Sequence, residues 1–172
     1  NYYYSLTSRK ISSLKSFLVS RRDRHSIGIH DYIGKILTKY FPAPFYLKFI
    51  KVINAKLDWK ILDIGSGAGE KLLALNRIGF KNILGIDPNL AEDIEYNKGL
   101  KILKKSLFDI EDIFDLILFN HSIEHMENPF AILKETAKKM VDDSIVVLRV
   151  PVAGCYAWKK YGTYWDGLDA PR

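Results

Sequence analysis

The segment ILDIGSGAGE, residues 61–70, constrains the fold of this chain more than any other feature. An apolar run ends there, Gly65, Gly67 and Gly69 follow, and an amphipathic run begins directly after them. Glycine permits positive φ and close approach of the backbone to a ligand, and a helix N-terminus offers free N–H groups. The segment therefore predicts a strand, a tight turn and a helix that together bind a nucleotide-like ligand.

From residue 59 onward, short apolar runs alternate with longer amphipathic ones, which is typical of a parallel sheet covered by helices. We expect helices at 69–79, where Gly79 is the C-cap, and at 128–140, where Asn128 is the N-cap and Pro129 the first residue. A short helix is expected at about 90–97. The predicted fold class is α/β, with a doubly wound, mainly parallel sheet in the order 3-2-1-4-5. Its strands are expected at 59–64, 82–87, 100–105, 114–119 and 144–150.

Residues 1–58 are expected to form a helical, basic lead-in to the α/β core at 59–152, and residues 153–172 an aromatic-rich loop. Helices are predicted at 11–20 and 30–40, separated by a charged stretch at 21–28, and FPAPF at 41–45 interrupts helix formation. Up to Lys60 the chain has 12 Lys and Arg against three Asp. This excess fits either a solvated helical face, which we favour, or a surface for nucleic acid or an anionic membrane.

The overall composition excludes several classes of protein. With 48% hydrophobic and 27% charged residues, the chain has the balance of a globular domain, and no apolar run approaches the roughly 20 residues that a spanning helix needs. The one cysteine, Cys155, cannot form an internal disulfide, and no signal peptide is evident. A cytoplasmic location is therefore expected.

The glycine spacing and the acidic residues indicate the kind of ligand. A dinucleotide-binding loop, G-x-G-x-x-G, would have its third glycine at position 70, where this chain has Glu70. A carboxylate at a helix N-terminus repels a pyrophosphate, so a ligand with positive charge and no phosphate fits better. Asp87 ends the second strand and can accept both hydroxyls of a ribose, or else cap the next helix.

Taken together, ILDIGSGAGE, Asp87, FDLILFNHSIEHMENP and SIVVLRVP resemble class I S-adenosylmethionine-dependent methyltransferases over about residues 59–152. E-H-x-x-x-P at 124–129 resembles one broad subgroup of them. The resemblance implies S-adenosylmethionine as the cofactor. It assigns the methionine part and ribose to the glycine loop and Asp87, the adenine to the end of the third strand, and the transferred methyl to the end of the fourth strand. The implied cofactor-binding residues are Asp63, Gly65, Ser66, Gly67, Gly69, Asp87, Pro88, Ser106, Leu107, Asn120, His121 and Ser122.

His121 is the candidate catalytic residue, because a hydroxyl acceptor needs a general base and ligands of open sheets bind at the carboxyl ends of the strands. The alternative is a histidine that only hydrogen-bonds the loop. Residues 121–125 also match H-x-x-E-H, a zinc signature. That signature needs both histidines on one helix, whereas here it directly follows a predicted strand, so we expect no metal.

The tail YGTYWDGLDAPR resembles a G-x-x-W-x-x-L-D-x-P-R segment of the same subgroup, which implies a small polar acceptor such as a sugar or a glycan or natural-product intermediate. Tyr164, Trp165 and Arg172 are the candidate acceptor-binding residues. The family's sixth and seventh strands are not expected within this sequence. Two alternatives remain: a cofactor-binding module without catalysis that acts on nucleic acid or membrane, and a nicotinamide oxidoreductase, which the position of Gly69 disfavours.

Overall fold

A six-stranded sheet in the order β3-β4-β2-β1-β5-β6 forms the centre of the computed structural model, which describes residues 12–165. All neighbouring strands run parallel except β3 and β4. The five predicted strands have the predicted order, and the doubly wound α/β fold class is confirmed. The strands are β1 (Ile61–Ile64), β2 (Ile83–Ile86), β3 (Ile94–Glu95), β4 (Lys101–Leu103), β5 (Phe114–Asn120) and β6 (Met140–Arg149).

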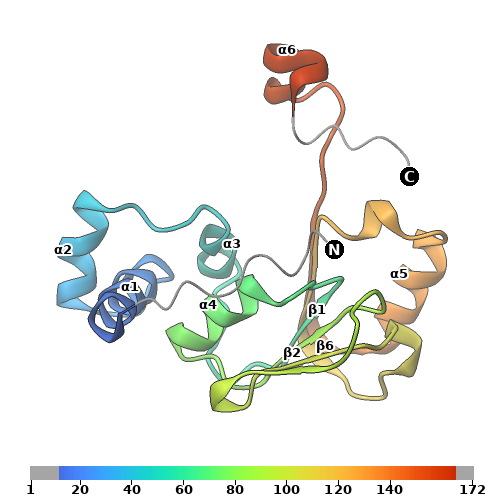
Figure 1. Ribbon diagram of the computed structural model, residues 1–172, viewed down its shortest axis with the longest axis horizontal. Coiled ribbons are helices and arrows are strands. Elements are labelled where there is room, and N and C mark those ends of the chain that lie inside the picture. Colours follow the sequence, from blue (N-terminus) through green and yellow to red (C-terminus); the bar gives the residue numbers. More distant parts are fainter. Residues whose placement is uncertain (1–11, 166–172) are drawn as a thin grey trace.

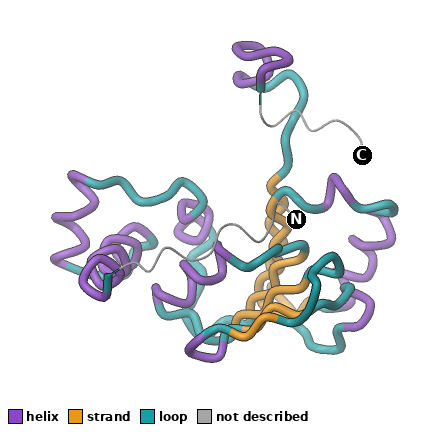
Figure 2. Tube along the Cα trace, viewed as in Figure 1, coloured by secondary structure: helices purple, strands orange, loops and turns teal. Residues whose placement is uncertain are grey.

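Helices cover both faces of the sheet, as Figure 2 shows. Helix α4 (Glu70–Ile78) packs on one face, and α5 (Pro129–Lys138) packs on the other. The alternation of side chains along a strand explains this arrangement. In β1, Ile61 belongs to the core beneath α4, whereas Leu62 and Ile64 belong to the core beneath α5. Asp63, which follows Leu62, therefore lies on the α4 side of the sheet.

The lead-in contains three helices: α1 (Ser13–Ser26), α2 (Tyr32–Tyr40) and α3 (Leu47–Val52). The predicted interruption at 21–28 is wrong for residues 21–26, because Asp23 is buried beside Arg22 and α1 continues to Ser26; Gly28, whose φ is 98°, follows the end of the helix. The sequence did not predict α3. Its Leu47 and Ile50 are fully buried in the core beneath α4, so tertiary packing stabilises this short helix.

The helix predicted at about 90–97 is wrong. This segment instead forms β3 and the 3₁₀ turn η1 (Asn97–Gly99). Ile94 pairs with Ile102 of β4, and the Asp93 carboxylate accepts the backbone N–H of Lys104 at 2.7 Å. Pairing with β4 thus satisfies backbone groups that a helix would otherwise satisfy.

The end of the predicted helix at 128–140 also differs from the structure. Asn128 caps α5 by accepting the N–H of Ala131, as predicted, but α5 ends at Lys138 and Met140 already begins β6. β6 ends at Arg149, one residue before the predicted end of that strand. A register irregularity opposite Phe114, with Asp143 at a φ of 64°, accommodates the additional residues of β6.

The aromatic-rich tail is not a plain loop. It contains α6 (Tyr156–Tyr161) and the 3₁₀ turn η4 (Gly162–Tyr164), with Cys155 Sγ accepting the N–H of Trp158 at the start of α6. Figure 1 shows α6 extending away from the sheet beyond the end of β6. Within residues 12–165, no helix is both long enough and apolar enough to cross a membrane.

Candidate functional site

The glycine loop lies where the carboxyl ends of the central strands meet. Ile64 at the end of β1 is level with Ile86 of β2 and Phe119 of β5. Gly65 has a φ of 73°, and a Cβ there would lie 2.5 Å from the Cβ of Ser122. Ser122 is held in turn, because its Oγ donates to the carbonyl of Ile64 at 2.6 Å. Only glycine at position 65 lets the loop pass this close to Ser122.

Asp87 holds the glycine loop from the neighbouring strand. Its Oδ2 accepts the backbone N–H of Gly67 at 3.0 Å, and its Oδ1 accepts the N–H of Asn89 at 2.9 Å. The residues directly after Asp87 form a turn and lead into β3, so the alternative that Asp87 caps a helix is wrong. Pro88 is exposed. No atom lies within 4 Å of the position that a Cβ of Gly67 would take, so the loop is open on that side.

A buried carboxyl group lies beneath the loop. Asp63 is 2% exposed, and its Oδ1 accepts an N–H from the side chain of Asn120 at 3.1 Å. The pKa of Asp63 is raised to about 6: burial is the main cause and the nearby charge of Asp87 adds to it, whereas the Asn120 hydrogen bond and the charge of Lys71 oppose the rise. Burial also lowers the pKa of Lys71. The two charges interact, but the cost of burying charge is the largest contribution for both.

His121 follows β5 in the left-handed backbone region, with a φ of 56°. Its backbone N–H donates to the carbonyl of Arg149, and its Nδ1 lies 3.6 Å from a carboxylate oxygen of Glu124. Partial burial, followed by the positive charge of Arg149, lowers the pKa of His121 below its ordinary value of 6.5, and Glu124 opposes this. The imidazole is therefore neutral at neutral pH and able to accept a proton.

The H-x-x-E-H motif does not form the continuous helical face that a zinc site of this kind requires. Only Ile123–His125 are helical, as the 3₁₀ turn η3, and His121 lies before it. Among residues 12–165, no three His, Cys, Asp or Glu side chains are grouped so that they could hold a metal ion.

Two residues assigned to the adenine are held by the protein itself. The backbone N–H and the Oγ of Ser106 both donate to the Asp109 carboxylate, at 3.0 and 2.9 Å, and these bonds lower the pKa of Asp109. Leu107 begins the 3₁₀ turn η2 (Leu107–Asp109) and is buried in the core beneath α5. Ser66 is also turned inward: its buried Oγ has no hydrogen-bond partner among the described residues and packs on Gly85.

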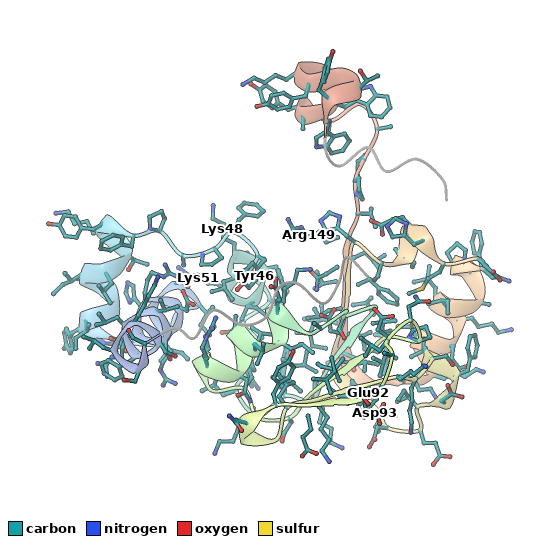
Figure 3. All side chains as sticks on the ribbon, in the orientation of Figure 1. Tyr46, Lys48, Lys51, Glu92, Asp93 and Arg149 are labelled. Carbon is teal, nitrogen blue, oxygen red and sulfur yellow. The ribbon has the colours of Figure 1, made fainter. Side chains whose placement is uncertain are left out.

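The structure adds three polar side chains that the sequence analysis missed. The Tyr96 hydroxyl donates to the carbonyl of Ala68 at 2.7 Å and so braces the glycine loop. Lys71 and Arg149 bring positive charge to the site: the charge of Arg149 helps to lower the pKa of Lys71, and both charges help to lower the pKa of His121. Figure 3 shows Arg149 projecting from β6 toward the side of α3 and α4. The position of Arg149 depends on the pairing of β6 with β5, which no local signal around this residue reveals.

The predicted acceptor-binding residues are not gathered with the cofactor residues. Tyr164 and Trp165 lie in and after η4, on the segment that extends from β6, and Trp165 packs edge-to-face on Trp158 at 6.3 Å between ring centroids. Arg172 lies outside the described residues. The assignment of these three residues to an acceptor stays a prediction.

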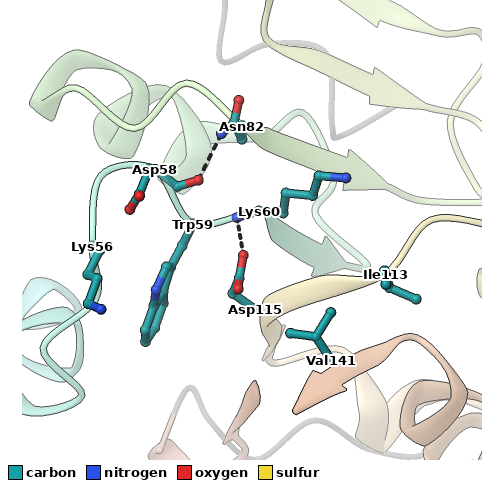
Figure 4. Close-up of a pocket in the computed structure, with 8 residues that line it drawn as sticks. All are labelled: Lys56, Asp58, Trp59, Lys60, Asn82, Ile113, Asp115 and Val141. Atoms are coloured by element: carbon teal, nitrogen blue, oxygen red, sulfur yellow. Dashed lines mark hydrogen bonds between the residues drawn. The ribbon is translucent and has the colours of Figure 1, made fainter. Parts of the chain in front are cut away.

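A hollow at the opposite ends of the strands is separate from this site. It lies at the amino ends of the strands, as Figure 4 shows, where Asp115 accepts the N–H of Lys60 at 2.7 Å and the side chain of Asn82 donates to the carbonyl of Asp58 at 2.8 Å. These bonds join the segment before β1 to β5 and to the residue that precedes β2, so their role is structural. Trp59 and Val141 are among its lining residues.

Comparison with known proteins identifies the family. The sequence model of a methyltransferase domain family matches residues 9–172, so the chain belongs to the methyltransferase domain family, as the motifs predicted. No curated protein sequence matches the chain significantly.

Solved structures of methyltransferases resemble the chain at low identity. The plantazolicin methyltransferase BpumL in complex with SAH has 19% identity and a TM-score of 0.49, with 78% of this chain and 59% of that chain covered. The ribosomal protein L11 methylase from Lactobacillus delbrueckii subsp. bulgaricus has 20% identity and a TM-score of 0.41, with 55% and 51% covered. The chain therefore spans about three fifths of the length of BpumL.

Proposed function

We propose that this chain is the cofactor-binding part of an S-adenosylmethionine-dependent methyltransferase. The observation that carries the proposal is the bond from Gly67 to Asp87, which joins the glycine loop to an acidic residue at the carboxyl edge of the sheet. Ligands of open α/β sheets bind at this edge. The family match over residues 9–172 supports the same assignment.

The residues present fit this cofactor. Gly67 leaves open space above the loop, and each Asp87 oxygen makes one hydrogen bond to the backbone, so each keeps a free acceptor site for a ribose hydroxyl. Asp63 offers a buried carboxyl group for the methionine part, and Lys71 and Arg149 offer positive charge for its carboxylate. No phosphate-binding group is needed. The bound cofactor supplies an electrophilic methyl group on a positively charged sulfur.

The remaining residues of the site position the acceptor and accept its proton. Methyl transfer is a direct displacement, so alignment and exclusion of water are the main tasks of the protein. Neutral His121, at the end of β5, would accept the proton of a hydroxyl acceptor. For the acceptor itself we propose a small polar molecule such as a sugar, which the resemblance of the tail at Tyr164, Trp165 and Arg172 supports.

The experiment that tests the proposal is a calorimetric titration of the chain with S-adenosylhomocysteine, with NAD and zinc as controls. We expect saturable binding in the micromolar range to the first ligand alone. Binding of NAD instead would favour an oxidoreductase. Absence of binding to all three would remove the cofactor assignment for this chain.

Replacing Asp87 by alanine will weaken binding of S-adenosylhomocysteine by roughly 1.5–3 kcal/mol, because it removes charge-assisted hydrogen bonds to the ribose and the brace on Gly67. The same titration measures the effect. Asp112→Ala, at an exposed site outside the cofactor loop, is the matched control and should leave the affinity unchanged. Equal affinities for the two variants would exclude Asp87 from the site.

Replacing His121 by asparagine will lower kcat by about 10²–10⁴-fold for a hydroxyl acceptor and leave the affinity for S-adenosylhomocysteine nearly unchanged. Asparagine tolerates the left-handed backbone at this position but cannot act as a base. Turnover by the longer protein, measured across pH, should lose its acidic limb in the variant. A variant with full turnover would assign the base elsewhere.

A further inference from the structure

Helix α2 is strongly amphipathic, yet its apolar face is exposed to solvent. Ile33, Ile36 and Tyr40 follow one another at i, i+3 and i+7 and therefore share one face of the helix. They are 41%, 64% and 68% exposed. A surface helix normally turns such a stripe toward the core.

The side of α2 that packs on the protein is a different one. Gly34 is buried against α1, and a Cβ there would lie 2.7 Å from the Cβ of His25. This close crossing leaves Tyr32, which is 75% exposed, and the apolar stripe on the outside. In Figure 1, α2 lies at the end of the lead-in farthest from the sheet. We call Tyr32, Ile33, Ile36, Tyr40 and Phe41 the α2 surface.

Positive charge borders the α2 surface. Lys35 and Lys39 are exposed on the same helix, and the Lys39 ammonium lies 5.8 Å from the centroid of the Tyr40 ring. Nearby acidic residues do not offset this charge. Asp23 is buried and paired with Arg22, and Asp31 is buried, paired with an arginine of α1, and caps α2. Residues 12–58 contain nine Lys and Arg against three Asp.

We propose that the α2 surface binds an anionic lipid bilayer, with the apolar side chains at the headgroup–acyl boundary and Lys35 and Lys39 at the lipid phosphates. Apolar and lysine side chains on adjoining faces of one helix are the pattern of an interfacial helix. Nucleic acid fits less well: the aromatic rings of this surface could stack on bases, but Ile33 and Ile36 offer bases neither stacking nor hydrogen bonds. A second copy of this surface would bring like charges together.

The test is flotation of the chain with vesicles made of equal parts phosphatidylcholine and phosphatidylserine, compared with vesicles of phosphatidylcholine alone. We expect at least about tenfold tighter binding to the anionic vesicles, reduced by salt. Ile36→Asp should lose at least about tenfold in affinity, because it introduces a charge into the apolar stripe. Because this side chain is exposed, its thermal unfolding should match that of the natural chain.

Matched controls lie on α5. Phe130→Asp makes the same kind of change at a side chain that is 84% exposed, and Lys134→Glu controls for the Lys35→Glu/Lys39→Glu variant. Neither control should alter vesicle binding, whereas the double variant should lose the preference for anionic lipid.

Three results would overturn the proposal. The first is equal binding of the natural chain to both kinds of vesicle, or binding to neither. The second is an Ile36→Asp variant that binds anionic vesicles as tightly as Phe130→Asp does. The third is concentration-dependent self-association or duplex DNA binding that Ile36→Asp abolishes while vesicle binding persists.

Discussion

Replacing Gly65 by alanine will lower the free energy of unfolding by about 2–5 kcal/mol and abolish binding of S-adenosylhomocysteine. The φ of 73° costs an L-residue about 1–2 kcal/mol. The added Cβ would also lie 2.5 Å from the Cβ of Ser122, and overpacking of this kind costs about 1–3 kcal/mol. Ser122 cannot move away freely, because its Oγ is bonded to the carbonyl of Ile64. Urea unfolding and calorimetric titration measure the two effects.

Gly67→Ala is the matched control for this prediction. Gly67 also has a positive φ, 54°, but a Cβ there meets no atom within 4 Å. Gly67→Ala should therefore lower the free energy of unfolding only by the backbone contribution, about 1–2 kcal/mol. The difference between the two variants isolates the contact of Gly65 with Ser122. Equal destabilisation of both variants would show that this contact does not limit the loop.

The parts of the fold that were predicted correctly are those whose signals are local. The glycine turn, the cap at Asn128 and the apolar strands each carry their own pattern, and the strand order follows from the βαβ alternation. The parts that were missed depend on distant partners. β3 forms because β4 lies beside it, and α3 is held because Leu47 and Ile50 enter the core beneath α4.

The candidate site divides in the same way. The positions of the glycine loop, Asp87 and the residues that follow β5 could be predicted, because parallel strands end at one edge of a sheet and loop residues at that edge meet; their role in binding stays a prediction. Arg149 could not be predicted, since it reaches the site only through the pairing of β6 with β5, which sets it level with Asn120. Tyr96 was missed because its segment was assigned to a helix.

Ser106 illustrates a different limit. The sequence indicates that it lies near the adenine, and it does follow β4, but its Oγ and N–H are both bonded to Asp109. A position at the correct edge of the sheet therefore does not establish that a side chain is available to a ligand. Its partner Asp109, three residues later in a capping box, decides whether Ser106 is available.

Replacing Asp63 by asparagine will stabilise the chain by about 3 kcal/mol at about pH 8 and change its stability little at about pH 4. Burial raises the pKa of Asp63 from 3.8 to about 6, so the folded chain favours the neutral carboxyl more than the unfolded chain does. The stability that the neutral Asp63 carboxyl contributes to the folded chain is fully present below pH 3.8 and is lost as the pH rises through about 6. Asparagine stays neutral at every pH and can still accept the N–H of Asn120.

The measurement is urea unfolding of both proteins over this pH range. Asp109→Asn is the control of opposite sign. Hydrogen bonds from Ser106 lower the pKa of Asp109, so this variant should destabilise the chain at neutral pH, and the difference should vanish only as the pH falls into the acidic range. Asp63→Asn should also weaken binding of S-adenosylhomocysteine if the carboxylate contacts the positively charged amino group of the ligand. A stability difference that is the same at every pH would mean that Asp63 does not ionise near 6. In that case Lys71, rather than burial, would control the charge of this carboxyl group.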